Sequence, residues 1–274
     1  MNPPGDIRLL LTDVDGTLVT KDKVLTEAAR AAAHELKAAG IALAVTSSRP
    51  PRGLRMLVQP LDLRLPLAGF NGGAMVQPDL SVIETLPIGL AASRKTVDFL
   101  SKQGLDVWVY TEADWYVSDP KGPHIEREAW ILKFDAKVAP TFDDEVLGQA
   151  IKIVGVSDQH ALVAASEAAA QDLLGTTASA TRSADYFLDV THPRATKGFV
   201  VARLAKHLNI SPQQVATIGD MPNDVLMFRQ SGFSIAMGNA SDAVKAQASA
   251  VTDSNEDDGF AKAVRRLLTT PARA

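Results

Sequence analysis

Apolar runs of strand length alternate with segments of helical spacing near the start of the chain. The run at 8–12 is typical of a short strand that is buried on both faces. Thr26 then precedes an alanine-rich helix at 27–40, and a second apolar strand follows at 41–47. Strand, helix and strand in this order form a βαβ unit, so the two strands should be parallel. A third strand is expected at 65–70.

The C-terminal part of the chain repeats the alternation of strands and helices. The expected strands are 215–220, 233–238 and 249–252, and the expected helices are 196–210, 222–232, 241–248 and 257–268. Such alternation at both ends predicts an α/β fold with a doubly wound parallel sheet. We therefore expect one core domain built from residues 1–83 and 191–274.

The middle of the chain, residues 84–190, has a different pattern and holds all three Trp and all three Tyr. Two strand-like runs at 105–110 and 114–119, joined by a short polar turn, predict a β-hairpin. Helices are expected at 90–104 and 158–175. This mixture predicts an α+β domain that is inserted into the core.

Composition narrows the functional classes. The 274 residues are 46% hydrophobic and carry a net charge of −4, so no general attraction to nucleic acid is expected. The absence of cysteine excludes disulfides and thiol catalysis. The N-terminus lacks the pattern of a signal peptide, and no apolar segment approaches the roughly 18 residues of a membrane span. We expect a soluble, cytoplasmic protein with no nucleic-acid or membrane partner; the sequence leaves its oligomeric state open.

Polar side chains gather where the predicted parallel strands end. Asp13 and Asp15 follow the first strand, Ser47 follows the second, and Asp220 follows a C-terminal strand. Lys197 stands at the start of a helix. In open parallel sheets, ligands bind beyond the carboxyl ends of the strands, so these side chains should converge at one edge.

The chemistry available to such a set is narrow. Crowded carboxylates repel one another unless a cation lies between them, and carboxylate oxygens suit Mg²⁺, which also binds phosphate. A lysine supplies a point charge for a phosphate oxygen. One carboxylate can attack phosphorus to form an acyl phosphate, and a second can exchange protons with the leaving oxygen and with water. The pattern indicates phosphoryl transfer.

Four short motifs carry a family resemblance. The sequences "DVDGT" at 13–17, "VTSSRP" around Ser47, "TKG" around Lys197 and "GDMPND" at 219–224 resemble, in order, the four motifs of the haloacid dehalogenase (HAD) superfamily of phosphohydrolases. The stretches "NGGAMV", "AMGNA" and "DDGFAKAV" resemble the Cof-type subfamily. This resemblance implies a HAD-like Rossmannoid core, with residues 84–190 as a large cap domain that sets substrate specificity.

The resemblance implies a role for each matching residue. Asp13 would be the nucleophile and a Mg²⁺ ligand, and Asp15 the general acid/base, with its backbone carbonyl as a second ligand. Asp220 would be the third ligand of the metal. The implied phosphate-binding residues are Ser47, Lys197 and Asn223, and the implied supporting residues are Asp224, Gly16 and Thr17.

The second motif departs from the subfamily pattern. The subfamily usually has Thr-Gly-Arg where this chain has Ser47, Ser48 and Arg49. Ser47 keeps the hydroxyl, whereas Ser48 adds a side chain and narrows the backbone options. We expect this change to affect the shape of the pocket more than the mechanism. Arg49 fits a structural role and a site-lining role equally well.

The expected function is Mg²⁺-dependent hydrolysis of a small phosphorylated metabolite, such as a sugar phosphate, through an aspartyl-phosphate intermediate. One alternative is a phosphomutase or phosphotransferase on the same fold, which passes the phosphate to a second alcohol. Another is a non-enzymatic signalling module that is phosphorylated on aspartate. Such receiver modules are single domains whose acceptor follows the third strand, so the position of Asp13 and the large insert argue against this alternative.

Overall fold

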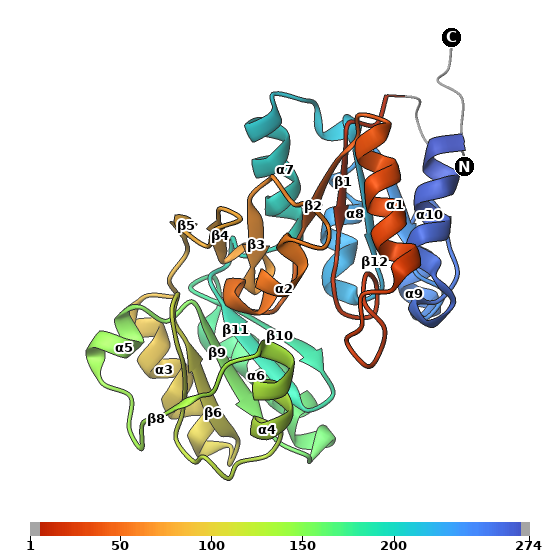
Figure 1. The fold of residues 1–274 in the computed structure, drawn as a ribbon. Helices are drawn as coiled ribbons and strands as arrows, with labels where there is room; N and C mark the ends of the chain where they lie inside the picture. Colours follow the sequence, from red (N-terminus) through yellow and green to blue (C-terminus); the bar gives the residue numbers. More distant parts are fainter. Residues whose placement is uncertain (1–5, 270–274) are drawn as a thin grey trace.

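A five-stranded parallel sheet forms the core of the computed structural model, which describes residues 6–269 (Figure 1). Its strand order is β14-β13-β12-β1-β2, and every neighbouring pair is parallel. The strands are β1 (Leu9–Thr12), β2 (Ala42–Val45), β12 (Val215–Gly219), β13 (Phe233–Ala236) and β14 (Ala250–Val251). Both ends of the chain contribute strands to this sheet, as the sequence predicts.

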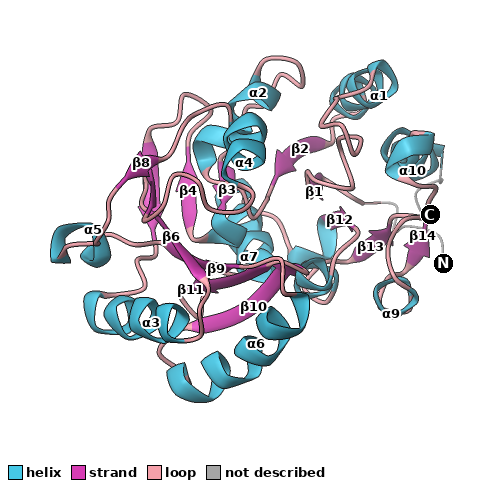
Figure 2. Ribbon diagram, turned by 90° about the horizontal axis from the view of Figure 1, so that it is seen from below, coloured by secondary structure: helices cyan, strands magenta, loops and turns pink. Residues whose placement is uncertain are grey.

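Helices pack on both faces of the core sheet (Figure 2). The bounds are α1 (Glu27–Ala38), α2 (Arg55–Val58), α7 (Lys197–Leu208), α8 (Val225–Phe228), α9 (Asp242–Lys245) and α10 (Gly259–Thr269). Leu10 of β1 packs with α1 and α10, whereas Leu9 and Leu11 pack with α7 and α8. Because side chains alternate along a strand, one apolar run of β1 serves both layers. The predicted doubly wound α/β core is confirmed.

A small antiparallel sheet follows the second core strand. It contains β3 (Leu67–Gly69), β4 (Ala74–Val76) and β5 (Val82–Thr85). The third predicted strand exists as β3, but a single parallel bridge between Thr46 and Ala68 is its link to the core sheet. The partners β4 and β5 have no counterpart in the sequence prediction, because their short runs show little alternation.

The second domain is built on a six-stranded sheet with the order β10-β11-β9-β6-β7-β8. All neighbours are antiparallel except β7 and β8. The strands are β6 (Asp106–Tyr110), β7 (Trp115–Val117), β8 (Lys137–Val138), β9 (Lys152–Val156), β10 (Ser179–Ala184) and β11 (Phe187–Thr191). Register pairs Trp108 with Val117 and Tyr110 with Trp115, so the predicted hairpin is present.

The two faces of the second sheet have different partners. The helices of this domain are α3 (Leu90–Lys102), α4 (Ile125–Leu132), α5 (Asp144–Gly148) and α6 (His160–Leu174). Leu100 of α3 and Val163 of α6 pack on one face of the sheet. Trp108 and Tyr110 on the other face pack with Phe70, which follows β3 of the core. An aromatic contact therefore joins the second domain to the core.

Two strands cross the limits proposed for the insert, 84–190. Strand β5 runs across the first boundary, and β11 continues to Thr191 at the second. We keep these limits as a proposal. No helix within the described residues is long and apolar enough to cross a membrane.

Candidate active site

A buried lysine links two carboxylates at the carboxyl edge of the core sheet. Asp13 comes directly after β1, and Lys197 is the first residue of α7, whose N-cap is Thr196. The Nζ atom of Lys197 donates hydrogen bonds to Oδ1 of Asp13 at 2.5 Å and to Oδ1 of Asp224 at 2.6 Å. All three charged side chains are buried. These residues are far apart along the chain, and the fold brings them into contact.

Asp224 closes the turn that follows β12. Its Oδ2 atom accepts hydrogen bonds from the backbone nitrogens of Asp220, at 2.9 Å, and Met221, at 2.8 Å. Its Oδ1 atom is bonded to Lys197. Both oxygens of Asp224 are therefore engaged, and its carboxylate holds the loop that carries Asp220.

Asp220 is surrounded by neutral donors. Thr17 donates through Oγ1 to its Oδ1 atom at 3.0 Å, and Asn239 donates through Nδ2 to its Oδ2 atom at 3.2 Å. Gly16 has a φ of +76°, and a Cβ atom there would lie 2.3 Å from Oδ2 of Asp220. Only glycine fits this close approach. Within residues 6–269, Asp220 forms no ion pair.

The buried carboxylates carry an excess of negative charge. Burial raises the pKa of Asp13 well above its ordinary value, although Lys197 opposes this shift. Burial and the neighbouring Asp224 raise the pKa of Asp220 to about 6. Burial alone would lower the pKa of Lys197, but Asp13 and Asp224 raise it above its ordinary value. One lysine thus does not neutralise the cluster.

This cluster fits a hard divalent cation. Asp13, Asp220 and Asp224 place carboxylate oxygens within 4.8 Å of one another. Because Asp224 already bonds a lysine and two backbone amides, Asp13 and Asp220 are the carboxylates with lone pairs left for a metal. An all-oxygen set of this kind suits Mg²⁺, and its charge would relieve the repulsion that raises the two pKa values.

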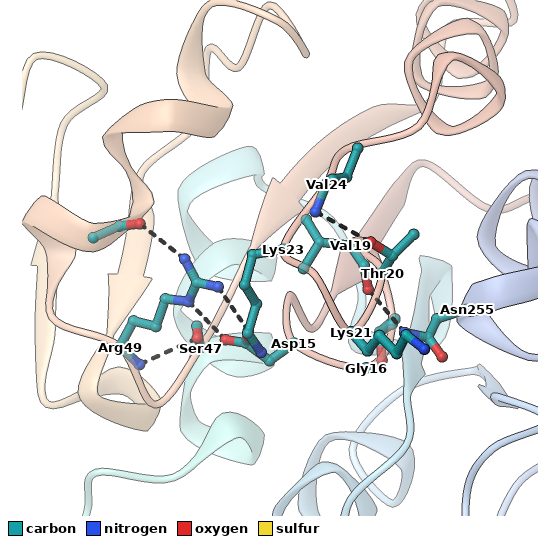
Figure 3. Close-up of polar contacts among 12 residues, drawn as sticks. Asp15, Gly16, Val19, Thr20, Lys21, Lys23, Val24, Ser47, Arg49 and Asn255 are labelled. Atoms are coloured by element: carbon teal, nitrogen blue, oxygen red, sulfur yellow. Dashed lines mark hydrogen bonds and ion pairs between the residues drawn. The ribbon is translucent and has the colours of Figure 1, made fainter. Parts of the chain in front are cut away.

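Asp15 is only two residues from Asp13 but lies in different surroundings, and Figure 3 shows its contacts with Arg49 and Lys23. Arg49 donates through Nε to Oδ2 at 2.7 Å and through Nη2 to Oδ1 at 2.6 Å. Lys23 donates to Oδ1 at 2.6 Å from the loop before α1. Burial tends to raise the pKa of Asp15, but the bonds and charges of Arg49 and Lys23 lower it to about 2. The carboxylate is held ionised, with both oxygens paired.

Ser47 follows β2, and Asn223 belongs to the short 3₁₀ helix Pro222–Asp224 that follows β12. The Oγ atom of Ser47 accepts a hydrogen bond from the backbone nitrogen of Arg49 at 3.1 Å. Asn223 donates through Nδ2 to Oδ1 of Asn71 at 3.1 Å, and its own Oδ1 is buried without a hydrogen-bond partner in the described chain. The hydroxyl proton of Ser47 is therefore free to be donated to a ligand.

A cavity opens between these segments and the second domain. Its wall contains four residues that the sequence predicts for the site: Asp13, Asp15, Lys197 and Asn223. Met221, Pro222, Ser48, Arg182 and Ser183 complete the lining. Ser48, which departs from the subfamily pattern, thus reaches the cavity wall. Ser47, Asp220 and Asp224 lie beside the cavity rather than in its lining.

Sequence reasoning missed four residues around the cavity. Asn239 follows β13 and bonds both Asp220 and the carbonyl of Gly16, at 2.9 Å, so the strand-end rule could have found it. Lys23 lies on a loop, and Arg182 and Ser183 lie near the end of β10 in the other domain. No local pattern marks these three, because tertiary packing alone brings them to the site.

Comparison with known proteins agrees with this architecture. The profile of the haloacid dehalogenase-like hydrolases matches residues 10–264. A Bacillus subtilis 5-amino-6-(5-phospho-D-ribitylamino)uracil phosphatase is 26% identical over 264 residues, which cover 96% of each chain. An HMP-PP phosphatase of Cronobacter sakazakii is 27% identical over 237 residues, which cover 85% of each chain.

A solved structure agrees at the level of the fold. The crystal structure of a haloacid dehalogenase-like hydrolase from Bacteroides thetaiotaomicron superposes with a TM-score of 0.85 at 24% identity, covering 95% of this chain and 99% of the other. The family profile spans nearly the whole of the described fold, both domains included. The chain therefore belongs to the haloacid dehalogenase-like hydrolase family, and it is a phosphatase.

Proposed function

We propose that this protein hydrolyses a small phosphate monoester with Mg²⁺ through an aspartyl phosphate formed on Asp13. The observation that supports this proposal most is the position of the Asp13 carboxylate. It lies in the cavity wall, bonded to Lys197 and close to the surplus negative charge of Asp220. A nucleophilic carboxylate needs this access, together with positive charge that keeps it ionised.

Asp13 supplies the attacking oxygen in this mechanism. One carboxylate oxygen forms a bond to phosphorus as the bond to the leaving alcohol breaks, which gives an acyl phosphate and the alcohol. Asp13, Asp220 and the backbone carbonyl of Asp15 are the proposed Mg²⁺ ligands. The bound metal supplies positive charge that keeps Asp13 ionised and offsets the charge of the phosphoryl oxygens.

Lys197, Ser47 and Asn223 are the proposed phosphate-binding residues. Lys197 carries a full positive charge between Asp13 and Asp224, so it can attract a phosphoryl oxygen while staying in place. The hydroxyl of Ser47 already accepts from the backbone of Arg49, which orients its proton toward other acceptors. Asn223 lies in the cavity wall beside them.

Asp15 is the proposed general acid and base. Its low pKa suits the second half of the reaction, in which an ionised carboxylate takes a proton from the water that cleaves the acyl phosphate. In the first half of the reaction, Asp15 must instead be protonated so that it can donate a proton to the leaving oxygen. Arg49 and Lys23 must therefore release Asp15 before it can donate a proton, because both of its oxygens are paired with them.

The cavity favours a small substrate. Residues of both domains line it, so the substrate must fit between the two domains. A lid formed by residues 84–190 would exclude a phosphate carried on a folded protein surface and would exclude water during the reaction. A sugar phosphate and a phosphorylated ribityl compound, such as the one in the name of the Bacillus subtilis relative, are candidates.

The proposal is tested by measuring release of inorganic phosphate from a panel of phosphorylated metabolites. Activity should require Mg²⁺, stop in excess chelator and return when Mg²⁺ is added back. Ca²⁺ should inhibit, because its longer and more numerous bonds spoil the geometry of transfer. Full activity in excess chelator would contradict the metal proposal. Transfer of phosphate to a second alcohol without release would favour a phosphomutase instead.

A further inference from the structure

Two residues of the second domain, Arg182 and Ser183, line the cavity opposite the catalytic carboxylates. Both lie near the end of β10, before the turn to β11. Every other lining residue comes from the core domain. Since the phosphoryl group must meet Asp13, the leaving part of the substrate extends toward these two residues.

Glu167 of α6 orients Arg182. One carboxylate oxygen of Glu167 accepts from the backbone nitrogen of Arg182 at 2.9 Å, and the other accepts from its Nε atom at 3.0 Å. Both bonds converge on a single residue, so they restrain the backbone and the guanidinium together. The orientation of Arg182 is thus set before any substrate binds.

The outer edge of this guanidinium is available to a ligand. In the described part of the chain, the Nη1 and Nη2 atoms of Arg182 have no hydrogen-bond partner. The other cation in the cavity wall, Lys197, is engaged by Asp13 and Asp224. Paired N–H groups of a guanidinium match the two oxygens of a carboxylate or a phosphate.

We propose that Arg182 binds a second oxyanion on the leaving part of the substrate, a carboxylate or a second phosphate, and that Glu167 is its positioning residue. This inference rests on the proposed function and adds a substrate class to it: phosphate monoesters whose alcohol is itself anionic. The carboxylates of Asp13 and Asp15 at the opposite wall repel this second anion, so the substrate enters with one orientation. A neutral alcohol would leave the Nη1 and Nη2 atoms of Arg182 without an anionic partner.

The test compares esters that share a three-carbon skeleton. Glycerol phosphate has a neutral alcohol, phosphoglycerate carries a carboxylate in its place, and glycerol bisphosphate carries a second phosphate. The wild-type protein should show a higher kcat/KM for at least one anionic ester than for glycerol phosphate. In Arg182→Ala this ratio should fall by about 10- to 100-fold, the range for loss of hydrogen bonds between charged groups. The preferred ester identifies which oxyanion is bound.

Three further variants separate binding from structure. Arg182→Lys keeps the charge without the paired N–H groups, so it should retain part of the preference. Glu167→Gln should lower the preference mainly through KM, because it loosens Arg182 without removing it. Arg94→Ala is the matched control: Arg94 also pairs with an acidic residue of the same domain, Asp144, but lies outside this cavity. It should keep the wild-type ratio.

The outcomes are distinguishable from failure of the proposed function. An unchanged ratio in a folded, active Arg182→Ala protein overturns this inference alone, as does a wild-type preference for the neutral ester. Absence of phosphate release from every ester by the wild-type protein, with Mg²⁺ present, overturns the proposed function and this inference with it. A ratio that falls equally in Arg94→Ala shows a general effect on the domain and also contradicts the assignment.

Discussion

Asp13 and Asp15 are separated by one residue, yet the fold gives them opposite electrostatic surroundings. Asp13 shares one lysine with Asp224 and lies near Asp220, so carboxylates outnumber cations and burial raises its pKa. Asp15 faces Arg49 and Lys23, so cations outnumber carboxylates and its pKa falls to about 2. Two aspartate side chains thus differ in their neighbours: Asp13 has too few cations around it, and Asp15 has more cations than carboxylates.

This difference separates the two catalytic roles that we propose. The cluster around Asp13 needs an added cation, which fits a carboxylate that binds Mg²⁺ and attacks phosphorus. Asp15 needs its cations to move away before it can carry a proton. Two carboxylates in unlike surroundings are a common basis for dividing nucleophilic and acid–base work in an active site. Substitutions of these two carboxylates and of their neighbours can test this contrast.

Asp13→Asn should lower turnover by about 10⁴-fold or more, the order of loss when an enzymatic nucleophile is removed. The amide oxygen attacks phosphorus poorly, although the variant relieves repulsion and should stay folded. Phosphate release and circular dichroism measure the two effects. Asp62→Asn is a suitable control, because it changes an ion-paired aspartate that lies outside the cavity lining. Substantial hydrolysis by Asp13→Asn would refute the assignment.

Asp15→Asn should lower turnover by about 10²- to 10⁴-fold, the usual contribution of proton transfer. An aryl phosphate, whose leaving group needs no proton, should separate this variant from Asp13→Asn by the time course of phenolate release. A rapid-mixing experiment should then show a burst of about one equivalent of phenolate followed by a stall, because the acyl phosphate forms but water is not activated. A burst from Asp13→Asn, or none from Asp15→Asn, would contradict the division of roles.

Mg²⁺ should stabilise the protein more at neutral than at acidic pH. The folded-state pKa of Asp220 is about 6, above the ordinary value of 3.8, so without metal this group favours folding at low pH. Its contribution is lost as pH rises from about 4 to 6, an effect of about 2–3 kcal/mol. Bound Mg²⁺ would remove the destabilisation caused by ionised Asp220. The increase in melting temperature on adding Mg²⁺ should therefore be larger at about pH 7 than at about pH 5. In Asp220→Asn the difference between the Mg²⁺-induced shifts at the two pH values should be much smaller. An equal shift at both pH values in the wild-type protein would argue against Mg²⁺ binding at Asp220.

Lys23→Ala should have the smallest effect, because Lys23 is one of two cations on Asp15 and is partly exposed. Because the pKa of Asp15 is lower in the folded protein, its ionised carboxylate stabilises the fold at pH values above the ordinary pKa of about 4. This stabilisation is lost as pH falls from about 4 to 2. Removing Lys23 should reduce this contribution by about 0.5–1 kcal/mol, as for other accessible ion pairs. Acid unfolding followed by circular dichroism should begin at a slightly higher pH. Lys21→Ala, in the same loop, should leave the acid transition unchanged.

Much of the core could be predicted from the chain because its signals are local. The buried strand before Asp13 and the strand before Asp220 are short apolar runs, and parallel strands place their carboxyl ends at one edge of a sheet. That rule is enough to predict that Asp13, Asp220 and Lys197 converge. It would also have reached Asn239, which follows a predicted strand and bonds Asp220.

The second domain was less predictable. Its hairpin at 105–119 and its two long helices follow from local patterning, whereas strands β4 and β5 at its border and the short α5 do not. Short elements carry few residues of pattern, and tertiary contacts stabilise them more than their own propensity does. The position of Arg182 in the cavity wall likewise depends on tertiary contacts rather than on local sequence.

The sequence by itself determined the kinds of residue at the site and the strands, in their order along the chain, that carry them. Only the tertiary structure decided the electrostatic state of each carboxylate. The pKa of Asp13 and of Asp15 depends on burial and on charges that lie within a few ångströms, and those charges come from Lys197, Arg49 and Lys23 on separate elements. Coulomb interactions and desolvation depend on distance in space rather than along the chain, so identical side chains two positions apart acquire opposite properties.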